Sequence, residues 1–335
     1  MIYYWKDIAQ DYKGTLLLGN GASIALSGNF SYHNIYEQGV KVGKIDSDIQ
    51  GLFSKFSANK DFEKLLRRLW AADFINKKFL VDVEEQKKVR EPYLKIRRSL
   101  INVIKDIHPD HKSLSNSLDV VTDFCSGFGK IFSLNYDLTL PWALDVNNDG
   151  AISKIFDDGF TSTQKDNKEI VALGYSPQTQ DDKVKVYYLH GNISIVQTKK
   201  NHDEKKLISK NDKSSLLKHV TEYWSRNDSQ PLFICEGDNS EKISAIYRSR
   251  YLTSAFESLK TDSNETLVIY GWSMSNADQH ILEAIKQNSS YKRVALSVHE
   301  SDQEYPAHAK RSLNAAGIND IRFFHSKSAK CWKYS

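Results

Sequence analysis

Short apolar runs alternate with amphipathic stretches along most of the chain, and this pattern predicts an α/β protein. The runs are too short for buried helices and are typical of strands buried on both faces. The predicted strands are Leu16–Leu18, Lys130–Leu134, Val184–Leu189, Pro231–Cys235, Thr266–Tyr270, Arg293–Val298 and Ile321–His325. Because helical patterns separate most of them, we expect a Rossmann-like, doubly wound, mostly parallel sheet.

One long helical stretch interrupts this alternation between the first two predicted strands. Apolar residues from Phe62 to Leu69 recur at the spacing of one helix face, so residues from about 58 to 125 predict a helical insertion. A further helix within it is expected to start after Pro92 and to stop before His108. The insertion is expected to belong to the same domain as the sheet.

Two polar regions predict variable loops within this single domain, which spans residues 1–335. Residues from about 147 to 182 are rich in Gly, Asn, Asp and Ser, which favour turns and hairpins. Residues from about 198 to 218 are rich in Lys and are expected to be exposed. The Lys-rich region is not interpreted as a binding surface.

Composition narrows the classes of function only slightly. The net charge of +4 comes from 46 basic and 42 acidic residues, a balance that gives no reason to expect direct nucleic-acid binding. The three cysteines, Cys125, Cys235 and Cys331, lie far apart and form no C-x-x-C pair, which argues against a structural zinc knuckle and a disulfide framework. No run approaches the roughly 18 apolar residues of a membrane span. We therefore expect a cytoplasmic protein.

Polar and small residues follow several predicted strands at their carboxyl ends, where ligands bind in open α/β sheets. These residues are Gly19, Asn20, Gly21, Ala22 and Ser23 after the first strand, Asn135 and Asp137 after the second, His190 after the third, and Gly271, Trp272, Ser273 and Ser297 near the ends of two later strands. Because the carboxyl ends of parallel strands share one edge, all of them are expected to lie along one crevice.

The stretch from Gly19 to Ser23 has two interpretations. Its glycines would let the backbone approach a pyrophosphate, with a helix beginning near Ser23. The G-x-G-x-x-G fingerprint is incomplete, however, because Ile24 stands at the third glycine position. A strand-to-helix turn that needs glycine only for its geometry explains the stretch equally well.

The ordered set of motifs resembles the sirtuin-like superfamily of NAD-consuming, Rossmann-type domains. Those domains carry a glycine-alanine-serine turn, then Asn-x-Asp, then His-Gly and finally Gly-x-Ser. Their counterparts here are Gly19–Ser23, Asn135–Asp137, His190–Gly191 and Gly271–Ser273. Within the superfamily the chain looks most like a bacterial family with the string Phe-Ser-x-Asn-Tyr-Asp and a Gly-Trp-Ser-Met turn. The four-cysteine zinc module of deacylating sirtuins is absent, so protein deacylation is not expected.

The resemblance implies that NAD is the substrate and that no metal is needed. It implies hydrolysis to nicotinamide and ADP-ribose by an anti-phage defence effector, acting as a homo-oligomer or with a defence-system partner protein. On this hypothesis Asn135 orients water or the ribose hydroxyls, His190 is a base, and Asp137 binds the carboxamide or holds the loop. The two glycine-containing turns would hold the diphosphate and adenosine.

Alternatives remain open from the sequence alone. Asp137 could equally cap a helix, and Asp278 is interpreted as a cap and not as a ligand contact. A different class of function is a subunit of a larger complex that senses NAD or another nucleotide without turnover. A hydride-transferring dehydrogenase is disfavoured by the missing third glycine.

Overall fold

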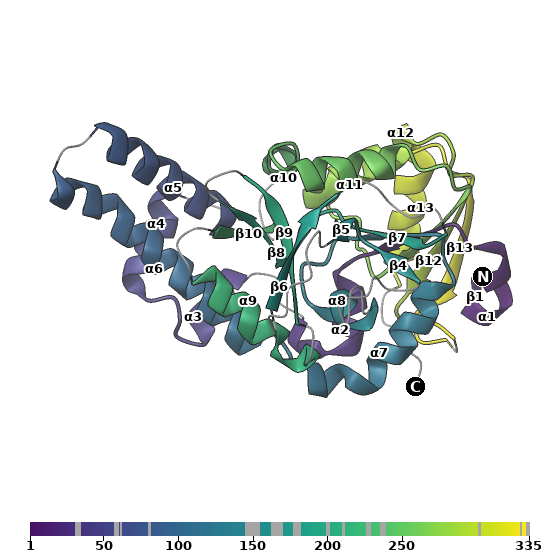
Figure 1. Ribbon diagram of the computed structural model, residues 1–335. Coiled ribbons are helices and arrows are strands. Elements are labelled where there is room, and N and C mark those ends of the chain that lie inside the picture. Colours follow the sequence, from purple (N-terminus) through teal and green to yellow (C-terminus); the bar gives the residue numbers. More distant parts are fainter. Residues whose placement is uncertain are drawn as a thin grey trace.

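A computed structural model shows an α/β fold with two sheets and a long helical arm that projects from one end (Figure 1). It describes residues 1–30, 35–56, 60, 62–79, 82–144, 155–161, 170–176, 182–198, 202–209, 212–225, 229–234, 239–300, 303–328 and 330–332. Cys235 and most of the predicted loop region 147–182 lie outside these residues. The other two cysteines, Cys125 and Cys331, are buried free thiols, and burial raises the pKa of each.

The larger sheet has eight strands in the order β1-β13-β12-β11-β2-β3-β7-β4, and every neighbouring pair is parallel. Its strands are β1 (Ile2–Tyr3), β2 (Thr15–Leu18), β3 (Lys130–Ser133), β4 (Phe156–Asp157), β7 (Val184–Tyr188), β11 (Thr266–Tyr270), β12 (Arg293–Val298) and β13 (Asp320–His325). All residues of β2 and β11 are buried, as expected for central strands with helices on both faces. The predicted α/β class and mostly parallel sheet are confirmed.

The direction in which strands are added reverses between β2 and β11. From β2 the chain adds β3 and then β7 on one side, whereas β11, β12 and β13 follow one another on the other side. Such a reversal opens a crevice at the carboxyl ends of the two strands, because the loops that leave them run to opposite faces of the sheet. The turn after β2 and the turn after β11 therefore meet at this point.

Helices cover the sheet and also form the arm. They are α1 (Trp5–Ile8), α2 (Asn20–Leu26), α3 (Ile35–Lys41), α4 (Ser47–Phe56), α5 (Phe62–Phe79), α6 (Val83–Ile107), α7 (His111–Ser126), α8 (Thr139–Leu144), α9 (Leu216–Trp224), α10 (Asn239–Ile246), α11 (Arg250–Lys260), α12 (Gln279–Gln287) and α13 (Tyr305–Ala315). In Figure 1, α5 and α6 extend side by side away from the sheets. No helix within the described ranges is both long enough and apolar enough to cross a membrane.

The predicted insertion at 58–125 holds α5, α6 and α7, but the expected start of its second helix is wrong. α6 begins at Val83, where the Asp82 carboxylate accepts a hydrogen bond from the Glu84 backbone N–H at 2.8 Å, and Pro92 lies inside the helix. The cap and the buried face of α6 outweigh the preference of proline for a first turn. The predicted end is confirmed, because His108 is the C-cap residue.

A second, antiparallel sheet was not predicted from the sequence. Its five strands lie in the order β10-β8-β9-β6-β5 and span Ser229–Phe233, Gly191–Thr198, Glu204–Ser209, Ile170–Tyr175 and Phe160–Thr161, respectively. The predicted strand Pro231–Cys235 overlaps β10 of this sheet. The expectation that residues 198–218 are exposed is wrong for β9, which is mostly buried and whose Lys206 pairs with Asp158. It is confirmed for His202, Asp203 and Asp212 on either side of this strand.

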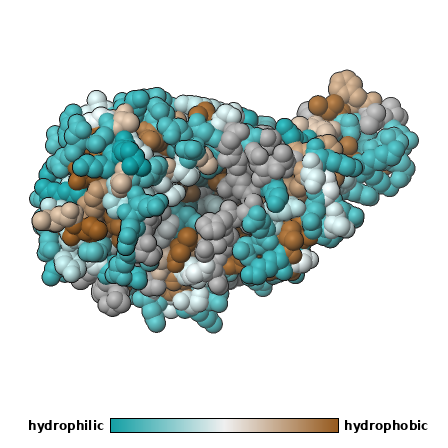
Figure 2. Space-filling model, turned by 180° about the vertical axis from the view of Figure 1, so that it is seen from behind, coloured by the Kyte–Doolittle hydropathy of each residue, from teal (hydrophilic) through white to brown (hydrophobic). Residues whose placement is uncertain are grey.

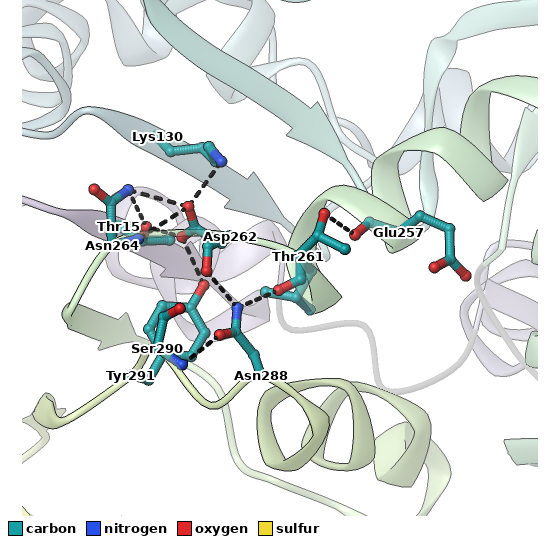
Figure 3. A network of polar contacts seen from close by, with 10 residues as sticks. Thr15, Lys130, Glu257, Thr261, Asp262, Asn264, Asn288, Ser290 and Tyr291 are labelled. Atoms are coloured by element: carbon teal, nitrogen blue, oxygen red, sulfur yellow. Dashed lines mark hydrogen bonds and ion pairs between the residues drawn. The ribbon is translucent and has the colours of Figure 1, made fainter.

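The amino ends of the central strands are joined by a buried polar network, shown in Figure 3. The Asp262 carboxylate accepts hydrogen bonds from the Thr15 hydroxyl of β2 and from the Tyr291 hydroxyl at 2.8 Å. Lys130 of β3 supplies the opposite charge, with its Nζ 2.7 Å from the same carboxylate. A buried charge is tolerated when it is paired and hydrogen-bonded in this way, so the network has a structural role.

Candidate functional site

The two glycine-containing turns contact each other through their backbones at the point where the strand order reverses. Gly271 adopts a φ of +70°, and a Cβ atom there would lie 2.3 Å from the backbone nitrogen of Ala22. A Cβ atom on Gly19 would lie 2.6 Å from the carbonyl oxygen of Gly271. Both distances are far below van der Waals contact, so the close approach of the two loops requires glycine at these positions.

Three backbone amides of the first turn already have partners within the protein. The Gly19 N–H donates to the Tyr270 carbonyl at 2.9 Å, the Gly21 N–H donates to the Gly271 carbonyl at 2.7 Å, and the Ala22 N–H donates to the Gly19 carbonyl at 2.9 Å. These are amides that a bound phosphate would otherwise use. The contacts therefore favour the interpretation of this stretch as a turn that needs glycine for its geometry.

The other residues predicted to bind the cofactor differ in accessibility. Asn20 and Ser273 are exposed beside the two turns, whereas Trp272 is buried. The Ser297 hydroxyl accepts a hydrogen bond from the Gly271 N–H at 3.0 Å, so its contact is with the turn. Ser23 is not the first residue of a helix, because α2 begins at Asn20 and Ser23 is buried within it.

Ser23, Asn135 and Asp137 lie together and form one hydrogen-bonded group. The Ser23 hydroxyl donates to Oδ2 of Asp137 at 2.6 Å, and the Asn135 amide nitrogen donates to the Ser23 oxygen at 3.0 Å. Oδ1 of Asp137 accepts from the backbone N–H of Thr139 at 2.8 Å, at the start of α8. Asp137 thus holds the loop and the amino end of α8, which were two of the roles left open for it.

Asn135 presents an acceptor toward which no described group donates. Its side chain is 9% exposed, and its Oδ1 atom has no hydrogen-bond partner among the residues that the structure describes. Because the amide nitrogen is held by Ser23, the side chain cannot turn over to satisfy this oxygen without losing that bond. A buried, unsatisfied acceptor is costly, so it is a natural position for a ligand hydroxyl or a bound water.

His190 is buried beside a second histidine that the sequence analysis missed. Its Nε2 atom lies 2.9 Å from Nε2 of His280, near the start of α12. Burial lowers the pKa of His190 well below its usual range and that of His280 to about 4, so both imidazoles are neutral near pH 7. The only sequence signal for His280 is its position two residues after Asp278, directly beyond the Gly-Trp-Ser turn.

The interpretation of Asp278 as a helix cap is wrong. It occupies the position before α12, but its side chain makes no capping hydrogen bond. Its Oδ1 atom instead lies 2.6 Å from Nζ of Lys242, and its Oδ2 atom lies 3.4 Å from the Trp272 indole nitrogen. Burial alone would raise the pKa of this carboxyl group, but His190 and Lys242 hold the pKa below its usual value. Asp278 is therefore the charged member of the histidine cluster.

The two groups lie against the same backbone segment. The backbone N–H of Leu189, the residue directly before His190, donates to the carbonyl of Ser133, two residues before Asn135, at 2.8 Å. The backbone N–H of Leu134 donates to the carbonyl of Leu18, the last residue of β2, at 2.9 Å. The Ser23–Asn135–Asp137 group and the histidine pair are thus both fixed to this segment, at the carboxyl edge of the sheet.

A cavity of about 420 Å³ lies between the helical arm and the second sheet. Its walls are mainly apolar and come from α5, α6, β10 and α11, with Arg97 and Arg248 among the polar lining residues. None of the residues predicted from the sequence to form the site lines this cavity. One lining residue connects the cavity wall to the site, because the Ile234 N–H donates to the carbonyl of His190 at 2.7 Å.

The comparisons with known proteins identify a family but no activity. No curated protein matches the sequence. A family model described as "Domain of unknown function (DUF4917)" matches residues 16–332, from the first central strand to the buried Trp332 near the end of the chain. The match includes the larger sheet except β1 and the first residue of β2, the whole second sheet, the helical arm and every residue of the candidate site. The chain therefore belongs to the DUF4917 family.

Proposed function

We propose that this protein binds NAD at the carboxyl edge of β2, β3 and β11 and hydrolyses the bond between nicotinamide and ribose. The observation that carries the proposal is the buried Asn135 amide, whose oxygen lacks a partner among the described residues while its nitrogen is held by Ser23. It lies where open α/β sheets bind nucleotides. The resemblance of the surrounding motifs to sirtuin-like domains supports NAD as the ligand.

The reaction needs little from acid catalysis. A water oxygen forms a bond to C1′ of the ribose while the bond from C1′ to the nicotinamide nitrogen breaks, and the electron pair of that bond neutralises the pyridinium charge. The proton of the attacking water passes to a base. The protein must therefore hold the ribose, exclude bulk water and position one water molecule.

Two side chains are suited to these tasks. The Asn135 oxygen can accept a hydrogen bond from the attacking water or from a ribose hydroxyl, in an orientation that Ser23 fixes. His190 is neutral near pH 7, because burial lowers its pKa, and a neutral imidazole can take the proton. Asp137 acts as a positioning residue in this scheme, because its carboxylate already bonds to Ser23 and Thr139.

The glycine turns have a modified role in the proposal. Because the amides of Gly19, Gly21 and Ala22 have carbonyl partners, the turns shape the floor of the crevice. The polar side chains of Asn20 and Ser273 are exposed beside these turns and are available to the diphosphate. Binding of the diphosphate by side chains predicts weaker phosphate affinity than a loop with several free amides would give.

The test is to incubate the purified protein with NAD and to separate the products by chromatography. We expect equal amounts of nicotinamide and ADP-ribose, and loss of both in Asn135→Ala and His190→Ala variants that retain the wild-type circular dichroism. Asn314→Ala and His111→Gln are matched controls outside the site and are expected to keep the activity. NAD binding without products would favour the sensing subunit, and an absence of both would contradict the proposal.

Such an activity removes a cofactor that every cell needs, so it suits an effector that is switched on only under attack. We place the protein in anti-phage defence on the basis of its resemblance to zinc-free sirtuin-like members, with a second copy or a partner protein as the activator. Cells that express the wild type are expected to lose NAD during phage infection, and cells that express Asn135→Ala are expected to keep it. Unchanged NAD in infected wild-type cells would contradict this role.

A further inference from the structure

The two buried histidines of the site face each other through the same type of ring nitrogen. Nε2 of His190 and Nε2 of His280 are 2.9 Å apart. A hydrogen bond at this distance requires one nitrogen to carry a proton and the other to carry a lone pair. The contact of the other ring nitrogen of His280, Nδ1, shows which of these two roles its Nε2 atom takes.

The tautomer of His280 follows from its bonds to Asn239. The side-chain oxygen of Asn239 lies 2.6 Å from the backbone nitrogen of His280, which always carries a hydrogen, so this oxygen acts as an acceptor. The same oxygen lies 2.8 Å from Nδ1 of the His280 ring. The ring must therefore carry its hydrogen on Nδ1, which leaves a bare lone pair on Nε2.

His190 has two possible tautomers. With its hydrogen on Nε2 it donates to the bare Nε2 atom of His280, and with its hydrogen on Nδ1 it presents a second lone pair to His280. The second tautomer suits a positive ion between the two nitrogens, because two lone pairs that face each other across 2.9 Å repel each other without one.

We propose that a divalent transition-metal ion of the zinc class binds between His190, His280 and Asp278. The ligand atoms of these three side chains lie within 4.8 Å of one another and come from the loop after β7 and from the start of α12. Imidazole nitrogens lie about 2.0–2.1 Å from bound zinc, which places two of them about 3.3 Å apart in a tetrahedral set. The two nitrogens in this structure are 2.9 Å apart, so a small separation of the rings admits a shared ion.

The surroundings of the cluster are those of a metal site. His280 donates its other ring N–H to the Asn239 oxygen, which is the usual way that ligand histidines are oriented. Asp278 supplies negative charge, and within the described part of the chain its Oδ2 atom has only a long contact with Trp272, at 3.4 Å. That oxygen can serve as the third ligand while Oδ1 keeps Lys242. A water molecule would complete a tetrahedral set.

An additional proton is the alternative occupant of the space between the two rings. The site stabilises a proton less well than a metal ion. A proton shared by the two rings would place an uncompensated charge at a buried position, because the Asp278 carboxylate is already paired with Lys242. An ion gains two bonds to neutral nitrogens and one to a carboxylate oxygen. Lys242 opposes either cation, so its removal is expected to strengthen metal binding.

The test is equilibrium dialysis of the full chain against Zn²⁺ or Co²⁺ without NAD, followed by elemental analysis. We expect one ion per chain and cobalt absorption bands typical of nitrogen ligands. Asn239→Ala is expected to weaken binding about 10- to 100-fold through loss of the orienting oxygen. His280→Gln is expected to remove the ion, Lys242→Met to tighten its binding, and His111→Gln, the matched control, to leave it unchanged.

Wild-type protein without bound metal, or His280→Gln protein that binds the ion as well as wild type, would overturn the proposal and leave the proton as the occupant. If His280→Gln does not fold, the cobalt spectrum of the wild type decides, and the absence of nitrogen-ligand bands would contradict the site. The inference is independent of NAD hydrolysis, because metal uptake is measured without NAD and hydrolysis can be assayed with a chelator present.

Discussion

Gly271 could be required for its left-handed backbone geometry or for the close contact between the two turns. Replacing it by alanine tests which of the two reasons applies. The chain offers a matched control in Gly43, which has a φ of +69° against +70° for Gly271. A Cβ atom on Gly43 would meet nothing within 4 Å, whereas one on Gly271 would lie 2.3 Å from the Ala22 nitrogen. The two substitutions therefore share the backbone strain and differ in the clash.

The expected costs follow from this difference. Left-handed geometry costs a residue with a Cβ atom about 1–2 kcal/mol, and Gly43→Ala should lose only this amount of unfolding free energy. Gly271→Ala must also separate the turns, at about 1–3 kcal/mol for overpacking, and weaken the hydrogen bond from Gly21 to the Gly271 carbonyl, at about 1 kcal/mol. We expect Gly271→Ala to cost about 2–4 kcal/mol more than the control.

Urea unfolding of both variants, followed by circular dichroism, measures the two losses directly. NAD binding should fall in Gly271→Ala and remain at the wild-type level in Gly43→Ala, because only the former moves the floor of the crevice. Equal losses of unfolding free energy would show that the clash does not operate and would refute the argument from close approach.

Three further predictions concern other parts of the molecule. Asp262→Ala should lower the unfolding free energy by about 3–5 kcal/mol in urea titrations, because it leaves Lys130 without its buried partner. Burial lowers the pKa of His108, whose Nε2 accepts the Leu138 N–H, so below about pH 6.5 the unfolded chain gains a proton that the folded chain does not. Stability should therefore fall as the pH drops below 6.5, by up to about 1.4 kcal/mol per pH unit, and less steeply in His108→Gln; parallel pH curves for the two proteins would contradict this. If both proposals above hold, Zn²⁺ should inhibit NAD hydrolysis by occupying His190, and a chelator should restore the rate in a product assay.

The parallel sheet was predictable because its central strands are buried on both faces. Strands such as β2 and β11 are continuous apolar runs, which a single sequence displays directly. The second sheet has no such signal. Lys206 of β9 reads as an exposed residue, and its burial depends on Asp158, a partner 48 positions away that no local pattern connects to it.

The candidate site shows the same division. Its turns and the residues after β3 follow from the rule that ligands bind at carboxyl strand ends, and the structure does bring Ser23, Asn135 and Asp137 together. His280 could not be found in this way, because its contact with His190 spans 90 positions and it lies on an amphipathic helix. Pairing across such separations is set by tertiary packing and not by periodicity.

Three N–H groups of the first turn bond to carbonyls of the protein, so specificity for a ligand has to come from other groups. A turn whose N–H groups bond to the neighbouring loop contributes shape, and the polar recognition passes to side chains that are already oriented. The Asn135 oxygen is buried and fixed through Ser23, so it loses little freedom when a ligand binds, whereas the exposed Asn20 must be ordered at a cost in side-chain entropy. Removal of the Asn135 amide should consequently impair ligand binding or turnover more than removal of the Asn20 amide, although Asn20 lies within the motif that resembles a phosphate-binding turn.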